Sequence, residues 1–555
     1  MARVLGINAV FHDPAAALVV DGETIAAAEE ERFSRRKHGK EAVPFSAWEL
    51  PGAAARFCLD QGGIGVEEID AVTYSYDPAL APPLGEDVTA DQFEGLRTLY
   101  AERAPRFLAT LLPGLEPDRF RFVPHHVAHA GSAHLASPYP DSAVLVLDGR
   151  GERTSHLGGH ARSGDLEVLA SQALPHSLGL LYEELTEHLG FRRSSDEYKV
   201  MALASYGDRE RFAGVLRDAV TTDGEGGFRV APLDLAALAA PRAPGKPMET
   251  DHADLAAAVQ MRLEEVIIDL ATWLHRKTGE RVITMAGGVA LNCVANARLA
   301  AEGPFDHVWV QPAAGDAGTA LGGAMAVAHE LGDEVAPLRG ADLGSGWSDD
   351  ELEEVLRAAG LPYERPRDLA DAVARRLAAG DVVGWFEGRS EYGPRALGHR
   401  SLLVDPRDAG NLQRMNDIKG RESFRPVAPM VALDQAADIF EGVIPSPYML
   451  FVHRVRPEWR GRIAAAVHVD GTARAQTIDR TQEPVMARVI DAFAAFTGVP
   501  VLINTSFNTV GRPIVDHPRE ALECFGAGPI GTLVLGPFVV RRGGLATAGS
   551  GHGEA

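Results

Sequence analysis

The chain has 555 residues, enough for two or three domains, and its 46% hydrophobic and 24% charged residues are typical of globular proteins. Its net charge of −23 disfavours a nucleic-acid surface, because phosphate contacts need concentrated lysine and arginine. Three cysteines (Cys58, Cys293 and Cys524) stand far apart, which excludes a cysteine-based metal cluster and favours a reducing, cytoplasmic setting. We expect no signal peptide and no membrane span, since residues 3–9 predict a strand and no apolar run approaches about 18–20 residues.

A strand–loop–strand–turn–strand unit is predicted at the start of the chain. The apolar run 3–9 is followed by the polar segment FHDP, and Asp21-Gly22 marks a tight turn between two further apolar runs. The same order returns at 142–170, where SAVLVLDG precedes a glycine-containing loop and two more strands. In both copies a polar loop follows the first strand, so the sequence predicts two related halves.

Two further segments each predict a strand, a glycine-rich join and a helix. VITMA leads into Gly287-Gly288 and a helix within 282–299, and 308–328 repeats the pattern around GDAG. Such a join is often only a tight turn, but it also permits close backbone approach and anion binding at the helix N-terminus. Two related halves with two such joins predict an α/β, actin-like ATPase fold, whose loops surround nucleotide phosphates. A Rossmann fold is disfavoured, because no GxGxxG follows the first strand.

The segment PHHVAHAGSAH contains a histidine pair with the spacing of metal ligands. His125 and His129 lie one turn apart on a helix, although single histidines are more often packed or solvated. His126 stands where a zinc protease has its glutamate base, so that function is disfavoured. Asp148 ends the strand of LVLDGRGE and Asp316 lies in GDAGTALG; each alone would be a turn or cap residue. Opposing loops of an actin-like fold would unite the four into a set that suits Fe(II), Mn or Zn.

The rest of this domain gives less definite signals. Residues 254–279 predict a long helix with a buried apolar stripe, whereas 221–252 are loop-rich and are interpreted as a lid or an acceptor-site insertion. In SSDEYKVMALASYG, Glu197 and Lys199 lie beside an apolar patch. They form either a surface ion pair before a helix or, for Lys199, a contact to nucleotide phosphate, and spacing alone does not decide.

A domain boundary is predicted near 338–348, where glycine and polar residues accumulate and Ser348-x-x-Glu351 forms a capping box. We therefore expect domains at 1–345 and 346–542, followed by a disordered, low-complexity tail at 543–555. The second domain is predicted to be α/β, with strands at 381–388, 425–433, 499–507 and 531–542.

Basic residues gather in turns around glycine and proline in this domain. They are Arg389, Arg395, Arg400, Lys419, Arg421 and Arg425. A solvated basic face is usually made of lysines on a helix, so arginines in turns favour bidentate oxyanion binding and a phosphate pocket. Arg474 and the segment NTSFN, with Asn504, Ser506 and Asn508, would complete the pocket, although NTSFN is also typical of an Asx turn.

The motifs HHVAHA, DGRGE, EYKVMALASYG, GGVALN, GDAGTALG, GRSEYGPRALGHRSLL, NDIKGRESFRPVAP and NTSFN, in this order, resemble those of NodU/CmcH-type O-carbamoyltransferases. These enzymes act in antibiotic and nodulation-factor biosynthesis, and the resemblance spans nearly the whole chain. It implies an N-terminal Kae1-like domain of the actin-like (ASKHA) class and a C-terminal YrdC-like α/β domain. The boundary sequence LGSGWS departs from the Gly-Pro form of many members, which affects no implied catalytic residue.

The resemblance implies a reaction in two steps. The YrdC-like domain forms carbamoyl-adenylate from carbamoyl phosphate and ATP with Mg(II), releasing phosphate and pyrophosphate. The Kae1-like domain then passes the carbamoyl group to a hydroxyl of a small-molecule acceptor and releases AMP. Amino-sugar, macrolide-sugar and polyketide hydroxyls all fit the acceptor. An activated carbamate hydrolyses in water, so enclosure between two domains is expected.

The resemblance also assigns residues to these steps. Fe(II), or another divalent metal, is implied at His125, His129, Asp148 and Asp316. Carbamoyl phosphate contacts are implied at Arg395, Lys419, Arg425, Arg474, Asn504 and Ser506. Nucleotide contacts are implied at Lys199, Gly287, Gly288, Asn292 and Gly315. Arg395 is also a catalytic candidate; His12 matches a position near the nucleotide, and either His12 or His126 would serve as general base for the acceptor.

Two other functions are weighed. A threonylcarbamoyl-transfer enzyme acting on tRNA has similar domains, but a net charge of −23 disfavours a tRNA surface. A non-enzymatic actin-like ATP-binding protein would leave the arginine-rich pocket without a role. We therefore expect carbamoyl phosphate, ATP and a hydroxylated acceptor as partners, no nucleic acid or membrane, and a monomer or homodimer.

Overall fold

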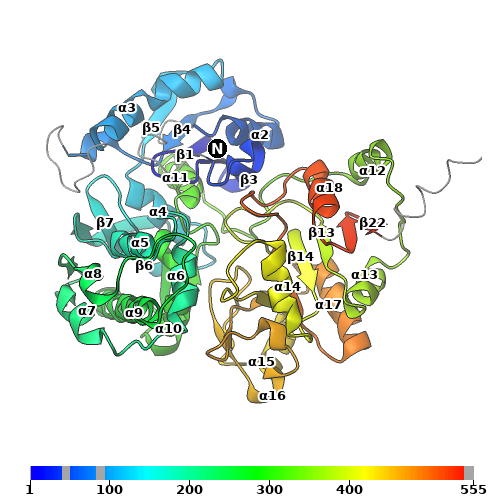
Figure 1. The fold of residues 1–555 in the computed structure, drawn as a ribbon. Helices are drawn as coiled ribbons and strands as arrows, with labels where there is room; N and C mark the ends of the chain where they lie inside the picture. The colour runs from blue at the N-terminus through cyan, green and yellow to red at the C-terminus, as the bar shows by residue number, and fades with distance from the viewer. Residues whose placement is uncertain (1, 40–49, 83–93, 543–555) are drawn as a thin grey trace, which may run out of the picture. The chain divides into compact units, whose positions relative to one another are not determined.

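The computed structural model describes residues 2–39, 50–82 and 94–542. Its internal contacts divide the chain into two compact α/β units, Met1–Arg339 and Gly340–Ala555 (Figure 1). The division falls a few residues before the expected boundary between 345 and 346. The tail 543–555, expected to be disordered, lies outside the described residues.

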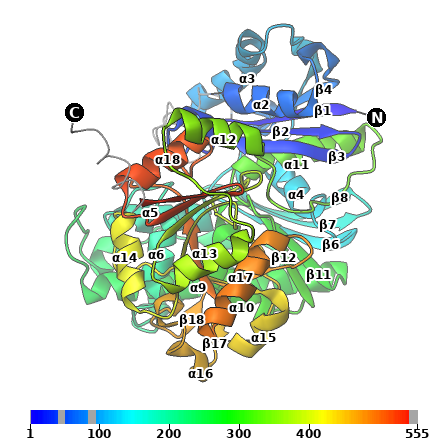
Figure 2. The same ribbon diagram turned by 90° about the vertical axis from the view of Figure 1, so that its right-hand side faces the viewer.

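The first sheet of unit 1 has the order β3-β2-β1-β4-β5, with β1, β2 and β3 antiparallel and β1, β4 and β5 parallel (Figure 2). Its strands are β1 Arg3–Asn8, β2 Ala15–Val20, β3 Glu23–Glu29, β4 Ala71–Tyr74 and β5 Phe120–Phe122. The predicted Asp21-Gly22 turn is confirmed, with φ of 54° and 82°, the left-handed values that a tight hairpin requires.

The second sheet repeats this topology in the order β12-β11-β6-β7-β8. Its strands are β6 Asp141–Leu147, β7 Thr154–Arg162, β8 Asp165–Ala173, β11 Val282–Ala286 and β12 His307–Val310. The antiparallel pairs β6–β7 and β7–β8 precede two parallel neighbours, as in the first sheet. The predicted duplication of the strand–loop–strand–turn–strand unit is therefore confirmed.

Helices cover the two sheets of unit 1. They are α1 Glu31–Ser34, α2 Gly52–Gly62, α3 Glu94–Leu111, α4 His125–His134, α5 Leu178–His188, α6 Glu197–Ala204, α7 Ala213–Ala219, α8 Leu235–Leu238, α9 Thr250–Thr278, α10 Cys293–Glu302 and α11 Ala317–Glu330. The predicted helix at 254–279 is α9, and its apolar stripe is buried. Segment 221–252 contains α8 and most of a short hairpin, β9 Val220–Thr222 and β10 Phe228–Val230.

Helix α11 packs on β1, β2 and β4 of the first sheet, helix α4 packs on β6, β7 and β11 of the second, and the two helices pack closely against each other. Their contact depends on glycine: a Cβ on Gly322 would lie 1.9 Å from the carbonyl oxygen of Ala128, and one on Gly131 would lie 2.6 Å from that of Gly322. Helix α11 meets β1 as tightly, since a Cβ on Gly6 would lie 1.8 Å from the carbonyl oxygen of Ala320. The small residues of these segments thus hold α4 in a fixed place.

Unit 2 is built on a seven-stranded mixed sheet of order β19-β15-β20-β14-β13-β21-β22, beside a small sheet of β16, β17 and β18. Its strands are β13 Val383–Phe386, β14 Arg400–Val404, β15 Ala428–Ala432, β16 Phe440–Glu441, β17 His453–Val455, β18 Thr472–Ala473, β19 Gln476–Ile478, β20 Leu502–Ser506, β21 Thr532–Leu535 and β22 Phe538–Arg541. The prediction of one strand at 531–542 is wrong. Gly536, at φ 55°, turns the chain there into a hairpin.

Two apolar layers flank the large sheet of unit 2. Val383 and Trp385 point into one layer with α13 and α17, whereas Phe386 points into the other with α12, α14 and α18. The helices are α12 Asp349–Ala358, α13 Leu369–Ala378, α14 Gly410–Ile418, α15 Leu433–Ile439, α16 Pro457–Arg460, α17 Pro484–Thr497 and α18 Pro518–Ala527. The predicted capping box of Ser348 and Glu351 is confirmed at the start of α12.

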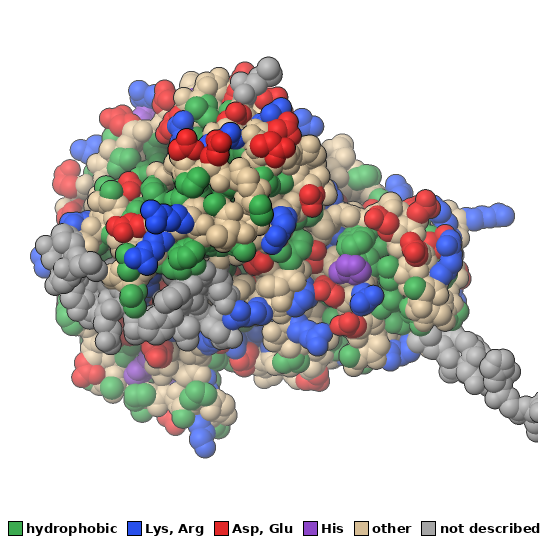
Figure 3. Space-filling view, turned by 90° about the horizontal axis from the view of Figure 1, so that it is seen from above, with side chains coloured by type: hydrophobic (Ala, Val, Ile, Leu, Met, Phe, Trp, Pro, Cys, Tyr) green, Lys and Arg blue, Asp and Glu red, His purple; other side chains and the backbone are tan. Residues whose placement is uncertain are grey.

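On the face drawn in Figure 3, acidic and basic side chains of the described residues are interspersed with apolar ones. Within the described part of the chain, no helix combines the length and apolarity that a membrane crossing requires.

We expect Gly322→Ala to destabilise unit 1 by about 1–3 kcal/mol or more, because the new methyl group would collide with the backbone of α4, which cannot yield. Thermal unfolding of the purified protein measures the effect. Gly214→Ala in α7 is the matched control, since a Cβ there meets nothing within 4 Å and should leave the midpoint unchanged or raise it. Equal midpoints for the two variants would contradict the close α4–α11 contact.

Candidate functional site

The predicted histidine pair lies on α4, which is buried along nearly its whole length. His125 and His129 are fully buried, and their ring centroids are 4.8 Å apart with the planes at 86°. His125 Nδ1 lies 3.0 Å from the carbonyl oxygen of Ser75 and donates its hydrogen there, which leaves Nε2 free to bind a metal. Small residues, Ala128, Ala130, Gly131, Ser132 and Ala133, make up half of the helix, so it can enter the core between the sheets.

The two predicted carboxylates reach the same place from different elements. Asp148 follows β6, and Asp316 stands at the N-cap of α11; both are buried. His125 Nε2 lies 3.3 Å from Asp148 Oδ2 and 3.7 Å from Asp316 Oδ1. His129 Nε2 lies 3.8 Å from Asp148 Oδ2 and 3.7 Å from Asp316 Oδ1. One ligand atom from each of the four residues lies within 4.8 Å of the others.

The cluster fits a divalent cation. Both ring nitrogens of His129 and Oδ2 of Asp316 have no hydrogen-bond partner, although they are buried, and buried polar atoms in proteins are normally bonded. Ligands that lie 2.0–2.2 Å from a metal at tetrahedral or octahedral angles are about 3–3.5 Å apart, close to the separations observed. Imidazole and carboxylate donors together suit Fe, Mn or Zn.

The electrostatics of the cluster also favour a cation. Burial lowers the pKa of His125, but Asp148 and Asp316 outweigh it and raise that pKa to about 9. Burial likewise opposes ionisation of Asp148, yet His125 and His126 hold its pKa well below the usual range. Two ionised carboxylates thus share one buried site, and their negative charge attracts a positive ion.

Glu152, which was not predicted as a site residue, anchors α4, the helix that carries His125 and His129. Its buried Oε1 accepts the backbone N–H of His125 and that of Asp77, both at 2.8 Å. It therefore binds the N-terminus of α4, where negative charge is favourable, and ties it to the residues after β4. Glu152 ends the motif DGRGE, but only the tertiary structure brings that motif to α4.

The two histidines considered as general base differ in access. His126 is buried, its Nδ1 lies 2.8 Å from Thr154 Oγ1, and its Nε2 has no accessible surface. His12 is 31% exposed and directs Nε2 towards Asp316 Oδ2, 3.9 Å away. Of the two, only His12 is placed to meet a substrate beside the cluster.

The glycine-rich joins meet at this cluster. Gly288 N–H donates to Asp148 Oδ1 at 2.9 Å, and Gly287 N–H donates to the carbonyl oxygen of Ala314, one residue before Gly315. Gly287 has φ 94°, and a Cβ there would lie 2.1 Å from the carbonyl oxygen of Leu147. Glycine is therefore required for the close approach of this loop to the end of β6.

The other predicted nucleotide residues have structural contacts. Asn292 caps α10 by accepting from Ala295 N at 3.1 Å and exchanges hydrogen bonds with Gln260. Lys199 lies on α6, with Nζ 3.0 Å from Asp196 Oδ2. The alternative interpretation expected a surface ion pair of Glu197 and Lys199, whereas the partner observed for Lys199 is Asp196, and the two side chains of this pair are only 16% and 15% exposed.

In unit 2, predicted phosphate-binding residues surround β20. Lys419, just after α14, donates to Ser506 Oγ at 2.8 Å and also contacts the carbonyl oxygen of Ser506 and Oδ1 of Asn508. Asn504, buried on β20, donates to the carbonyl oxygen of Ala396 at 3.0 Å and to Gln476 Oε1 at 2.7 Å.

These contacts bring the other predicted residues to the same region. Arg395 directly precedes Ala396, and Arg474 stands two residues before Gln476. Arg425 lies just before β15, which pairs with β20. The sequence analysis missed Glu391, whose buried Oε1 accepts the N–H groups of Leu397, His399 and Arg400 at 2.6, 3.0 and 3.2 Å. Glu391 thereby fixes the loop that carries Arg395.

Two members of the arginine group donate to backbone carbonyl oxygens. Arg400 is fully buried, and its guanidinium donates to the carbonyl oxygens of Glu387, His399, Ser345 and Gly388 at 2.9–3.3 Å. The prediction that Arg400 binds an oxyanion is therefore wrong. Arg389 similarly donates to the carbonyl oxygens of Leu343 and Gly344.

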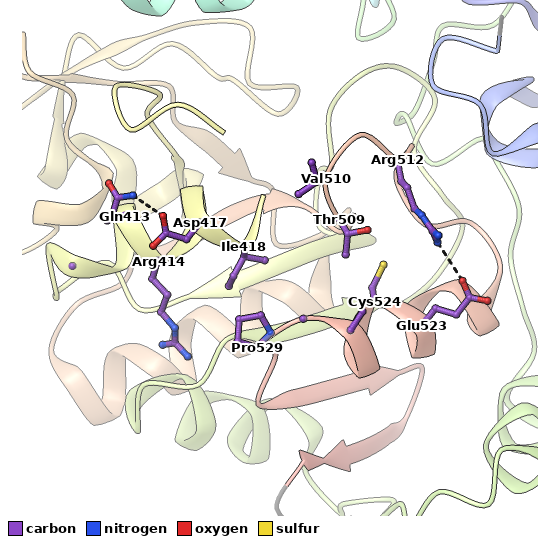
Figure 4. Close-up of a pocket in the computed structure, with 13 residues that line it drawn as sticks. Gln413, Arg414, Asp417, Ile418, Thr509, Val510, Arg512, Glu523, Cys524 and Pro529 are labelled. Atoms are coloured by element: carbon purple, nitrogen blue, oxygen red, sulfur yellow. Dashed lines mark hydrogen bonds and ion pairs between the residues drawn. The ribbon is translucent and has the colours of Figure 1, made fainter. Parts of the chain in front are cut away.

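A separate cavity of about 880 Å³ lies between α14, the loop Thr509–Arg512 and α18 (Figure 4). Arg512 and Glu523 pair across one side at 3.4 Å, and Gln413 bonds Asp417 on the other at 2.7 Å. None of its lining residues belongs to the predicted site.

We expect His129→Ala to lose bound divalent metal, because it removes one donor from a four-donor set in which His129 has no other polar partner. Metal analysis of the purified protein measures this. His307→Gln, at an exposed position on β12, should keep the wild-type metal content. A normal metal content in His129→Ala would refute the ligand assignment.

Comparison with known proteins places this architecture in a family. The model of the carbamoyltransferase N-terminus matches residues 3–325, and that of the carbamoyltransferase C-terminus matches residues 374–542. Nodulation protein NolNO of Sinorhizobium fredii is 38% identical over 96% of this chain and 80% of its own length. An uncharacterized Synechocystis protein is 36% identical over 98% of this chain and 97% of its own. The solved structure of T. kodakarensis HypF is 16% identical with a TM-score of 0.39, over 59% of this chain and 48% of that chain. From the two family matches, the chain belongs to the carbamoyltransferase family.

Proposed function

We propose that the protein is an ATP-dependent O-carbamoyltransferase that modifies a hydroxyl group of a small secondary metabolite, such as an antibiotic sugar or a polyketide. The observation that carries this proposal is the pair of opposite electrostatic sites within one carbamoyltransferase-family chain. Unit 1 holds a buried anionic cluster of two aspartates and two histidines, and unit 2 gathers lysine and arginine around β20. The first suits a cation and the second a phosphate.

In this proposal, unit 2 is YrdC-like and forms carbamoyl-adenylate. Carbamoyl phosphate is hydrolysed to carbamate and phosphate. An oxygen of the carbamate then attacks the α-phosphorus of Mg(II)-bound ATP, and the bond to the pyrophosphate leaving group breaks. Lys419, Arg395, Arg425 and Arg474 supply positive charge for the phosphate, while Asn504 and Ser506 orient the carbamoyl end. The contacts of Lys419 with Ser506 preorganise part of this site.

Unit 1 is proposed to be the actin-like, Kae1-like transfer site. Its repeated strand order and the meeting of its two glycine-rich joins support this proposal. His125, His129, Asp148 and Asp316 would hold a divalent metal, with Fe(II) as the expected ion, which supplies Lewis-acid stabilisation of negative charge when bound. The glycine-rich joins at Gly287 and Gly315 offer backbone N–H groups and space for the adenylate.

His12 is the proposed general base of the transfer. Its Nε2 takes the proton of the acceptor hydroxyl as that oxygen bonds to the carbamoyl carbon. The bond from this carbon to the AMP oxygen breaks, so that AMP leaves with the electron pair. Burial of His126 supports the choice of His12 over its competitor.

We expect the wild-type protein to form AMP only when ATP, carbamoyl phosphate and an acceptor are all present. Mass spectrometry over a panel of hydroxylated metabolites should detect one product in which a carbamoyl group replaces a hydroxyl hydrogen. Absence of AMP and pyrophosphate formation under all conditions would refute the adenylate mechanism.

Variants should separate the two steps. Lys419→Ala should reduce pyrophosphate release about 10²-fold or more, because it removes phosphate-stabilising charge. His129→Ala should retain pyrophosphate release and lose carbamoyl transfer. Lys277→Ala, at an exposed position at the end of α9, is the charge-matched control and should retain both steps. Loss of both steps in His129→Ala would contradict the division of labour between the units.

A further inference from the structure

A line of hydrogen-bonded side chains begins at His12 and runs away from the metal cluster. His12 Nδ1 lies 2.9 Å from Asp13 Oδ2. The other oxygen of this carboxylate, Oδ1, lies 2.9 Å from His38 Nδ1. His38 Nε2 in turn lies 2.9 Å from Ser195 Oγ. The network therefore runs from the Ser195 hydroxyl through the His38 imidazole and the Asp13 carboxylate to the imidazole of His12, the proposed base.

One carboxylate determines the tautomers of both imidazoles. Burial opposes ionisation of Asp13, but His38 and His12 hold its pKa well below the usual range. An ionised carboxylate only accepts hydrogen bonds, so both histidines donate Nδ1–H to it. Whenever one of these rings is neutral, its Nε2 carries the lone pair. For His38 this nitrogen accepts from the Ser195 hydroxyl, and for His12 it faces Asp316.

The backbone at three of these places is strained. Asp13, His38 and Ser194 have φ of 46°, 64° and 56°, left-handed values that residues other than glycine seldom adopt. Such conformations persist where surrounding contacts fix them. Asn8, fully buried at the end of β1, donates to the carbonyl oxygen of Asp13 at 2.9 Å, and Glu31 Oε2 accepts from His38 N at 2.7 Å.

A second metal site is not the reason for this arrangement. Asp13, Glu31 and His38 have ligand atoms within 4.8 Å of one another. However, both oxygens of Asp13 and both ring nitrogens of His38 are engaged in the hydrogen bonds described, and Glu31 accepts from the His38 backbone. The cluster is a completed network rather than a set of open donors.

We propose that Asp13 and His38 are positioning residues for His12, and that Ser195 completes their network. Asp13 holds the Nδ1–H tautomer of His12 and turns its Nε2 to the metal cluster, while His38 fixes the second oxygen of Asp13. This inference rests on the transfer reaction proposed above. Because Ser195 precedes α6 in the second half of unit 1, its bond to His38 links the base to the segment that carries Lys199.

Two variants test the network while keeping the left-handed backbone conformation at positions 13 and 38. Asparagine tolerates left-handed φ values, so Asp13→Asn and His38→Asn remove the charge or the ring while preserving the local conformation. We expect the kcat of carbamoyl transfer to fall about 10²–10⁴-fold in Asp13→Asn, with little change in the acceptor KM. His38→Asn should show a smaller fall in kcat, since Asp13 still reaches His12.

Controls separate positioning from folding and from metal binding. Asp21→Asn is the matched control, because Asp21 has φ 54° in the exposed β2–β3 turn and should retain wild-type transfer. Metal content and pyrophosphate release should be unchanged in all three variants. Ser195→Ala should lower transfer modestly, and Ser195→Thr, which keeps the hydroxyl, should restore it.

Proton NMR provides a readout that does not depend on the reaction. The ring N–H of His12, hydrogen-bonded to Asp13, should give a downfield resonance that disappears in Asp13→Asn and in His12→Asn. Wild-type kcat in Asp13→Asn, or retention of that resonance, would overturn the inference. If the wild-type protein carbamoylates no acceptor while the resonance behaves as expected, the proposed reaction fails and the orientation of His12 stands.

Discussion

The structure of unit 1 depends on the burial of two carboxylates of like charge in one place. Asp148, after β6, and Asp316, at the start of α11, lie against the same two imidazoles at 3.3–3.8 Å. Each ion would lose several kcal/mol of hydration without compensation. Gly288 N–H and the histidines offset part of this loss, and a bound cation would offset more. Glycine packing of α4 against α11 holds the four residues at these distances.

The predicted site of unit 2 is basic, although the whole chain is strongly acidic. Lys419 and neighbouring arginines gather around β20, and buried carboxylates such as Glu391 are used to shape the loops that carry them. Arg400 illustrates the distinction between structure and function within one motif, because both of its terminal amino groups donate to backbone carbonyl oxygens. The anion site proposed for unit 2 and the cation site proposed for unit 1 would suit a reaction that first activates a phosphorylated substrate and then stabilises charge during transfer.

Local patterns predicted much of this structure from sequence. The hairpin units, Ser348 cap and apolar stripe of α9 depend on neighbouring residues, and all are confirmed. The cluster of His125, His129, Asp148 and Asp316 could be predicted because the expected fold brings its separate motifs together. Glu152 and Glu391 were missed because their partners are backbone groups. Strand β14 was not predicted because glycine-rich sequence precedes it. The break at Gly536 was not predicted because apolar residues stand on both sides of it.

The duplicated hairpins also explain how one fold supplies different chemistry from equivalent positions. Asn8 pairs with Ala15 across the first hairpin, and Asp148 N bonds the carbonyl oxygen of Ser155 across the second, so the two loops have the same length. Asn8 therefore corresponds to Asp148, and His12 to Glu152. In the second half these positions provide a candidate metal ligand and the anchor of α4. In the first half they provide a backbone clamp and the proposed base, so the duplication places both sets of groups at one cluster.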